Sequence, residues 1–88
     1  MNIHETTIHA TCPINGQWDY YHVTFQTDKF LKAEDFEHAA DQVRGLRDTQ
    51  ERVAGVMAHA IPVSGTLTLS GSHTANSSTT VKTNVSRR

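Results

Sequence analysis

The spacing of apolar residues along this chain changes from a period of two to a helical period and back, which limits the folds open to it. Tyr21, Val23 and Phe25 alternate with polar residues, and this pattern predicts a half-buried strand at about residues 19–27. From Lys32 onward, apolar residues recur three and four positions apart, as they do along one face of a helix. We therefore expect the chain to change from strand to helix near this lysine.

The same reasoning divides the whole chain into six elements. Alternating stretches predict strands and helically spaced stretches predict helices, at residues 3–10, 19–27, 32–44, 48–61, 66–69 and 81–85. Pro13 and Gly16 predict a turn between the first two strands, and a polar, turn-prone link is expected at residues 73–78. Asp48 is expected to be the N-cap of the second helix, because Glu51 follows it three residues later as in a capping box.

The order of these elements, ββααββ, predicts an α+β fold with a four-stranded, mostly antiparallel sheet and two helices on one face. One domain is expected at residues 1–86, followed by a frayed tail at 87–88. Such a sheet has two open edges and one uncovered face, and a chain of 88 residues with a hydrophobic fraction of 36% builds only a thin core. We therefore expect a homo-oligomer in which the sheets of several copies join into a larger barrel.

Charge and cysteine content narrow the partners and the compartment. The net charge is −1 and the charges are dispersed, which argues against a groove for DNA and against binding to an anionic membrane. No apolar stretch is long enough to cross a bilayer, and the first residues lack the apolar run of a signal peptide. The single cysteine excludes an intramolecular disulfide and favours a reducing compartment, so a cytoplasmic location is expected.

That cysteine begins the segment Cys12-Pro13-Ile14-Asn15-Gly16-Gln17-Trp18-Asp19, which spans the turn between the first two strands. A thiolate beside a proton donor is sufficient for covalent chemistry on an electrophilic carbon, so Cys12 and Asp19 are the candidate catalytic residues. Each also has a structural explanation, since a lone cysteine often serves as a small hydrophobe and an aspartate often stabilises a turn. Trp18 would either stack on a planar ring or cover the thin core.

The element order and this segment resemble the tunnelling fold, a superfamily that includes GTP cyclohydrolase I, pterin synthases and the 7-cyano-7-deazaguanine nitrile reductases of queuosine synthesis. The nitrile reductase signature Cys-Pro-Val-Thr-Gly-Gln-Pro-Asp matches in register at Cys12, Pro13, Gly16, Gln17 and Asp19. The resemblance implies a purine-like substrate at a subunit interface of a barrel. It also implies that Cys12 attacks the nitrile carbon to give a thioimide and that Asp19 supplies or relays the proton.

The start of the second helix also carries a resemblance. Gln50-Glu51-Arg52 resembles a Gln-Glu-Arg sequence of GTP cyclohydrolase I, which implies that Glu51 accepts hydrogen bonds from the N–H groups of a guanine-like base. Glu51 is also explained as a carboxylate that caps a helix start. Nitrile reductases have His-Glu at this place, and here Gln50 replaces the histidine.

A third segment, Ser70-Gly71-Ser72-His73, resembles a strand end of GTP cyclohydrolase I that carries a histidine and, two residues later, a zinc-binding cysteine. His73 matches the histidine and is a candidate substrate-binding residue, with an ordinary surface turn as the alternative. Ala75 takes the place of the cysteine, and a catalytic zinc site needs about three protein ligands. We therefore expect no metal, and zinc-dependent cyclohydrolase chemistry is disfavoured.

The segment Thr27-Asp28-Lys29-Phe30-Leu31-Lys32 aligns with the Glu-Ser-Lys-Ser-Leu-Lys of nitrile reductases, which is associated with NADPH. The lysines and the leucine match, whereas the glutamate and both serines are absent. The motif is therefore degenerate: NADPH is possible, but the sequence gives no firm indication of a cofactor. A short, cofactor-free class related to these reductases lets an amine attack the thioimide, giving an amidine such as that of archaeosine in transfer RNA. This short chain with an altered cofactor segment fits that class, and transfer RNA is an expected partner only in that case.

The sequence thus favours a nitrile-processing, QueF-like enzyme that acts on 7-cyano-7-deazaguanine or a close analogue. Cys12 is the expected nucleophile, Asp19 the proton donor, and Glu51, His73 and Trp18 the residues that bind the substrate. Resolution of the adduct by an amine is favoured over resolution by hydride. The alternatives are NADPH-dependent reduction, a cyclohydrolase-like pterin or purine reaction, and a non-catalytic oligomeric module that kept a purine pocket.

Overall fold

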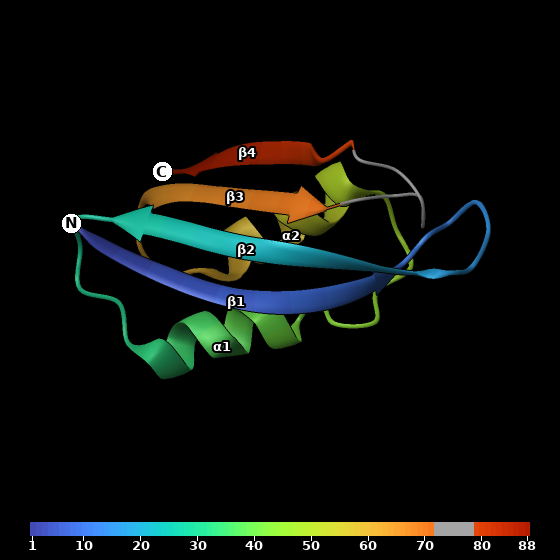
Figure 1. Cartoon of the computed structure of the whole chain (residues 1–88). Coiled ribbons are helices and arrows are strands. Elements are labelled where there is room, and N and C mark those ends of the chain that lie inside the picture. The colour runs from blue at the N-terminus through green and yellow to red at the C-terminus, as the bar shows by residue number, and fades with distance from the viewer. Residues whose placement is uncertain (72–78) are drawn as a thin grey trace.

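The computed structural model describes residues 1–71 and 79–88, which form one antiparallel sheet and two helices (Figure 1). The elements follow the order β1 (Asn2–Thr11), β2 (Trp18–Thr27), α1 (Ala33–Asp41), α2 (Gln50–Ala60), β3 (Gly65–Gly71) and β4 (Val81–Arg87). The predicted ββααββ order and α+β class are confirmed. The predicted link at 73–78, and with it His73, lies outside the described residues.

The strands are adjacent in chain order, and each neighbouring pair is antiparallel. β1 and β2 form a long hairpin in which Thr11 pairs with Trp18 next to the turn. The turn closes tightly because Gly16 has a φ of +73°, a conformation that favours glycine, and because the Cys12 N–H donates to the Gln17 carbonyl over 2.7 Å. The turn therefore holds the cysteine at a defined place at the end of the sheet.

One face of the sheet and both helices enclose the core. The helix-facing strand residues are apolar and buried, as the alternation predicts: Ile8, Ala10, Tyr21, Val23, Phe25, Leu67 and Leu69. α1 packs against β1 and α2 packs against β3 and β4, so both helices cover the same side of the sheet, as predicted (Figure 1). No helix within residues 1–71 and 79–88 is long and apolar enough to span a membrane.

The opposite face of the sheet is left uncovered by the elements that the structure describes. Because successive strand residues point to opposite sides, this face carries many hydroxyl side chains: Thr7, Thr11, Thr24, Thr66, Thr68, Ser70 and Ser86. Two large aromatic residues interrupt it, Trp18 and Tyr20, which are 62% and 59% exposed. The open face expected from the sequence is thus present, and it is polar enough to be in contact with water.

The start of α2 differs from the prediction. Its N-cap is Thr49, whose side chain accepts a hydrogen bond from the Arg52 N–H over 3.3 Å. Asp48 does not cap the helix, because its carboxylate accepts from the neighbouring Thr49 N–H over 2.8 Å. Glu51 is consequently the second residue of the helix. The predicted capping box, which needs its glutamate at the third residue, is wrong.

Two other element boundaries also differ. α1 ends at Asp41, and Gly45, with a φ of +79°, instead donates its N–H to the His9 carbonyl of β1 over 2.9 Å. The residues after α1 therefore run along the edge of β1 rather than continuing the helix. β4 includes Arg87, whose Nε donates to the Ile61 carbonyl over 3.0 Å, although the sequence assigns this arginine to the tail.

Candidate functional site

The β1–β2 turn, the first residues of β2 and the start of α2 meet around one pocket of about 290 Å³, which we call the Cys12 pocket. Three of the residues expected to carry function line it: Cys12, Asp19 and Glu51. The other lining residues are Pro13, Ile14, Tyr21, Asp48, Thr49, Gln50 and Val81. Segments far apart in the sequence therefore bring a thiol and several carboxylates to one place.

Cys12 is a half-buried free thiol just after the end of β1. The chain beside it is attached to the connection between the helices, since the Thr11 N–H donates to the Leu46 carbonyl over 2.9 Å and Thr11 forms a parallel bridge with Arg47. Arg47 also donates from Nη2 to the Pro13 carbonyl over 3.3 Å. These bonds hold the turn that carries the thiol against the helical layer.

Asp19 and Tyr21 lie two positions apart on the helix-facing side of β2, and both are buried. Their side chains are hydrogen-bonded, with the Tyr21 hydroxyl donating to the Asp19 carboxylate. Burial is the largest cause that raises the pKa of Tyr21 above its usual range, and the negative charges of Asp19, Cys12 and Glu51 add to it. Tyr21 is therefore protonated at neutral pH and is a hydrogen-bond donor inside the pocket.

Gln50, the first residue of α2, attaches the start of the helix to the sheet. Its side chain is buried, and its amide donates to the carbonyls of Leu69 over 3.2 Å and Val81 over 3.0 Å. A buried amide is costly without partners, so these bonds fix the helix start beside β3 and β4. Glu51 then stands exposed at the pocket, near the positive end of the helix. At the position where nitrile reductases carry a histidine, this chain thus has Gln50, whose side chain is bonded to backbone carbonyls of the sheet.

The other two residues predicted to bind substrate are not part of this pocket as described. Trp18 lies on the open face of the sheet, where its ring stacks on His9 with the ring centroids 4.7 Å apart. Because neighbouring strand residues point to opposite faces, Trp18 and Asp19 are on opposite sides of β2. His73 lies outside the described residues, and its role stays a prediction.

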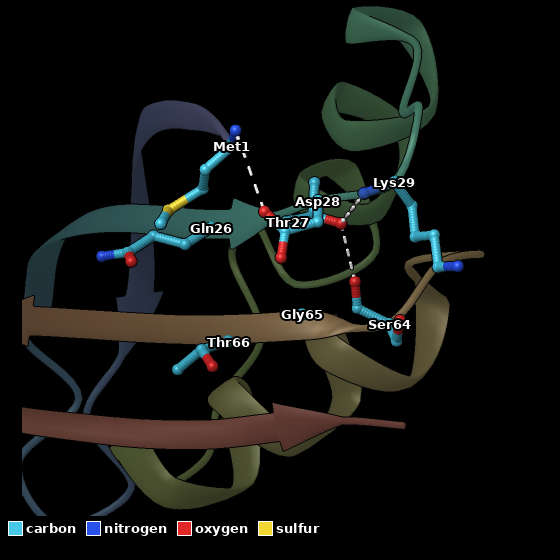
Figure 2. Close-up of a pocket in the computed structure, with 8 residues that line it drawn as sticks. All are labelled: Met1, Gln26, Thr27, Asp28, Lys29, Ser64, Gly65 and Thr66. Atoms are coloured by element: carbon cyan, nitrogen blue, oxygen red, sulfur yellow. Dashed lines mark hydrogen bonds and ion pairs between the residues drawn. The ribbon is translucent and has the colours of Figure 1, made fainter.

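Lys29, one of the two lysines in the segment aligned with the NADPH motif, lies at the other end of the sheet. Lys29 follows the end of β2 and Cys12 precedes its start, and a strand of ten residues is about 30 Å long. Lys29 lines a separate pocket of about 460 Å³, at which the Thr27 hydroxyl donates to the Ser64 carbonyl over 2.7 Å (Figure 2). Within one chain, Lys29 is therefore out of reach of the Cys12 pocket.

The chemical character of the Cys12 pocket is acidic. Its polar lining includes one thiol and the carboxylates of Asp19, Asp48 and Glu51, and none of the described residues that line it is a lysine, arginine or histidine. Carboxylates accept hydrogen bonds, so the pocket suits a ligand rich in N–H donors and disfavours a phosphate. Among residues 1–71 and 79–88, no three histidine, cysteine, aspartate or glutamate side chains are placed to hold a metal ion.

Tyr21 and Gln50 line the pocket although the sequence alone does not assign a function to either. The alternation that predicts a core position for Tyr21 also places it on the side of Asp19, and this is the signal that identifies it. For Gln50 there is no such signal, because the burial of its amide depends on carbonyls of β3 and β4 that are distant in the sequence.

No family model matches the sequence, and no curated protein does. Among solved structures, the crystal structure of the archaeosine synthase QueF-Like in the apo form is similar to this chain, with a TM-score of 0.77 and 18% sequence identity. The match covers 97% of this chain and 90% of that one. At this identity the likeness establishes the fold alone: the four-stranded ββααββ fold of this chain is shared with that structure.

Proposed function

We propose that this chain is a QueF-like enzyme that acts on 7-cyano-7-deazaguanine, or on a related deazapurine nitrile, through a covalent thioimide on Cys12. One observation carries the proposal: Glu51, from the start of α2, lines the same pocket as Cys12 and Asp19, which flank the β1–β2 turn. The fold that the chain shares with an archaeosine synthase supports the same class of reaction.

In the first step, the thiol of Cys12 adds across the C≡N bond of the substrate. A bond forms between Sγ and the nitrile carbon, one π bond of the nitrile breaks, and the thiol proton ends on the nitrile nitrogen. Asp19 relays this proton, accepting it from the thiol and delivering it to the nitrogen. The thioimide contains all the atoms and electrons of the thiol and the nitrile, so this step needs no reductant.

Glu51 anchors the base in this mechanism. The amino-pyrimidinone edge of a deazaguanine presents N–H groups side by side, and one carboxylate accepts two such hydrogen bonds. The helix N-terminus beside Glu51 stabilises its negative charge. The acidic lining of the Cys12 pocket supports recognition of a base by its donor groups rather than of a nucleotide by its phosphate.

An amine is the proposed second substrate. It adds to the thioimide carbon, the bond to Sγ breaks, and the products are an amidine and the free Cys12 thiol. The position of Lys29, at the end of β2 far from Cys12, supports this branch over reduction by NADPH. The chain would then serve 7-deazaguanine metabolism of the archaeosine type, with transfer RNA as a partner. Because the thiol must stay unoxidised, we propose a cytoplasmic location.

Product analysis tests the proposal. The protein is incubated with 7-cyano-7-deazaguanine and either an ammonium salt or NADPH, and the products are identified by mass spectrometry, with Cys12→Ala as the control. We expect the amidine in the ammonium reaction and none from the variant. If the reaction with NADPH instead gives a primary amine as product, the thioimide is resolved by reduction and not by attack of an amine. Tight binding of the nitrile without any product would overturn the proposal that the chain is an enzyme, and would favour a non-catalytic module that binds purines.

A further inference from the structure

Tyr21 is held in the Cys12 pocket by a glycine on the neighbouring strand. It pairs with Gly71 of β3, and its ring fills the space that a side chain would occupy there: a Cβ on Gly71 would lie 2.3 Å from Tyr21 Cδ1. The side chain is 1% exposed, and its hydroxyl is bonded to Asp19. The sheet therefore fixes the tyrosine ring, and the ring fixes the position of its hydroxyl beside the carboxylate.

From this geometry we propose that Tyr21 is a positioning residue for the reaction of Cys12 and that it acts through Asp19. This role rests on the proposed function, because it belongs to the same thioimide step. The Tyr21 hydroxyl donates to the Asp19 carboxylate and holds it in place, and this carboxylate takes the thiol proton and passes it to the nitrile nitrogen.

The charges around the hydroxyl explain why a donor is needed at this place. Among the residues that the structure describes, the ionisable groups that act on Tyr21 are Asp19, Cys12 and Glu51, and each of them is negative when it is ionised. A hydrogen bond donated to a carboxylate stabilises its charged form, which is the form that can accept the thiol proton. Phenylalanine would fill the same space in the sheet and donate nothing, which makes it the informative substitution.

The first test follows adduct formation with 7-cyano-7-deazaguanine by intact mass in the wild-type chain and in Tyr21→Phe. We expect the variant to form the adduct about tenfold more slowly, because the relay carboxylate is no longer held in place. The pH–rate profile should also change, because the relay carboxylate loses a donated hydrogen bond. Circular dichroism checks that both chains are folded. An unchanged rate and profile would overturn the role of Tyr21 while leaving the proposed function intact.

A second test does not depend on the nitrile. Iodoacetamide labels Cys12, the single cysteine of the chain, and its rate against pH reports the thiolate. We expect Tyr21→Phe to shift this labelling profile, because the charge of Asp19 beside the thiol is then less compensated. In an Asp19→Asn background the same substitution should have no effect, as it must if Tyr21 acts through Asp19. Equal shifts in both backgrounds would contradict the proposal. The predicted shifts without any nitrile adduct would instead contradict the proposed function alone.

Discussion

At the scale of single residues, the structure separates two explanations of Glu51. A capping glutamate stands at the third helical position and bonds back to the N-cap, whereas Glu51 stands at the second, and the Thr49 side chain makes the capping bond to the Arg52 N–H. The capping box therefore does not account for Glu51. Its exposed carboxylate at the Cys12 pocket is the feature that the ligand role explains.

The ligand role of Glu51 predicts a loss of affinity on Glu51→Gln. In a Cys12→Ala background, which keeps binding non-covalent, the Kd for 7-cyano-7-deazaguanine should rise about thirtyfold, or about 2 kcal/mol, because charge-assisted hydrogen bonds are lost. Glu34 occupies the same second position in α1, outside the pocket, so Glu34→Gln is the matched control. Calorimetry should show no change for the control. Equal effects of the two substitutions would mean that helix charge, not ligand contact, is being measured.

The close approach of Tyr21 to Gly71 predicts that Gly71→Ala destabilises the protein. The new Cβ would meet the Tyr21 ring at 2.3 Å and the Tyr20 carbonyl oxygen at 3.2 Å. The resulting overpacking should cost about 2 kcal/mol and lower Tm by about 10 °C in thermal unfolding. At Gly55, inside α2, a Cβ would meet no neighbouring atom within 4 Å, so Gly55→Ala should instead stabilise by about 0.5 kcal/mol. A wild-type Tm for Gly71→Ala would contradict the packing described here.

The raised pKa of Tyr21 predicts a loss of stability in alkali. The folded chain holds the phenol proton more tightly than the unfolded chain does, since burial and nearby negative charge oppose ionisation. This contribution is fully present below about pH 10, the ordinary value for tyrosine, and is lost as the pH rises further, at up to about 1.4 kcal/mol per pH unit. Urea unfolding on both sides of this pH measures it. The decline should be smaller in Tyr21→Phe, and equal declines in both chains would refute the prediction.

At the scale of elements, hydrophobic periodicity located all six strands and helices, because the apolar residues of each lie mainly on one face. The boundaries that differ coincide with single hydrogen bonds, such as that from the Thr49 N–H to Asp48 and that from the Gly45 N–H to His9, which no period reveals. The assignment of Trp18 shows a related limit. A continuous sequence segment suggests one site, but the pleat of β2 puts Asp19 on the helix side and Trp18 on the open face.

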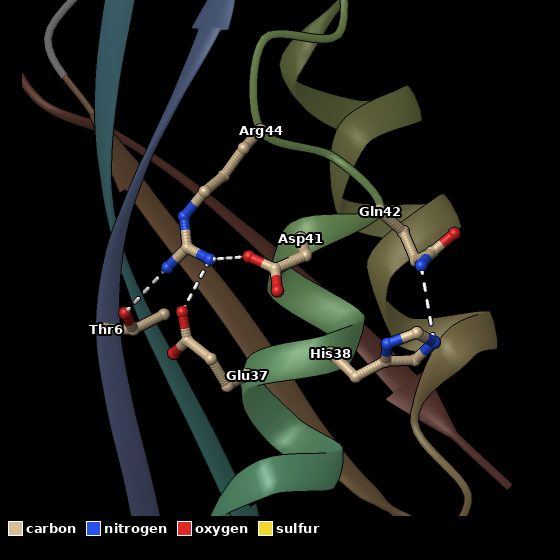
Figure 3. A network of polar contacts seen from close by, with 6 residues as sticks. All are labelled: Thr6, Glu37, His38, Asp41, Gln42 and Arg44. Atoms are coloured by element: carbon tan, nitrogen blue, oxygen red, sulfur yellow. Dashed lines mark hydrogen bonds and ion pairs between the residues drawn. The ribbon is translucent and has the colours of Figure 1, made fainter.

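Arg44 joins α1 to β1 and gives a test of this packing. Its Nη1 contacts Glu37 at 2.5 Å and also Asp41, and its Nη2 donates to the Thr6 hydroxyl of β1 over 3.4 Å (Figure 3). Because the side chain is about three-quarters buried and has several partners, Arg44→Gln should cost about 1 kcal/mol in urea unfolding. Arg52, 72% exposed with one partner, is the comparison, and Arg52→Gln should cost less than about 0.5 kcal/mol. A smaller loss for Arg44 than for Arg52 would contradict its bridging role.

At the scale of the whole molecule, the Cys12 pocket depends on contacts between distant segments. The turn after β1 is bonded to the connection between the helices, and Gln50 bonds the start of α2 to β3 and β4. Local sequence patterns identified Cys12 and Asp19 in one segment and Glu51 in another. Their meeting in one pocket follows from the register of the sheet and the placement of α2, which local patterns do not encode.

The sheet also leaves edges that favour assembly. Within the described residues, β4 pairs only with β3, and the backbone at the outer edge of β1 is bonded only near its end, at residues 9–11. We propose that copies of the chain pair through these edges and form a homo-oligomer, with the polar open face toward its interior. Light scattering after size exclusion should give a mass of several chains at micromolar concentration. A monomeric mass would contradict the proposed assembly.

The intact mass of the protein after mixing with 7-cyano-7-deazaguanine tests the central claim, that the Cys12 pocket forms a covalent thioimide. The wild-type chain should gain the mass of one nitrile molecule. Cys12→Ala should gain none, and Asp19→Asn should gain it more slowly. Because the chain has a single cysteine, the site of attachment is then unambiguous. A wild-type chain that stays at its own mass under saturating nitrile, or a Cys12→Ala chain that still forms the adduct, would contradict the claim.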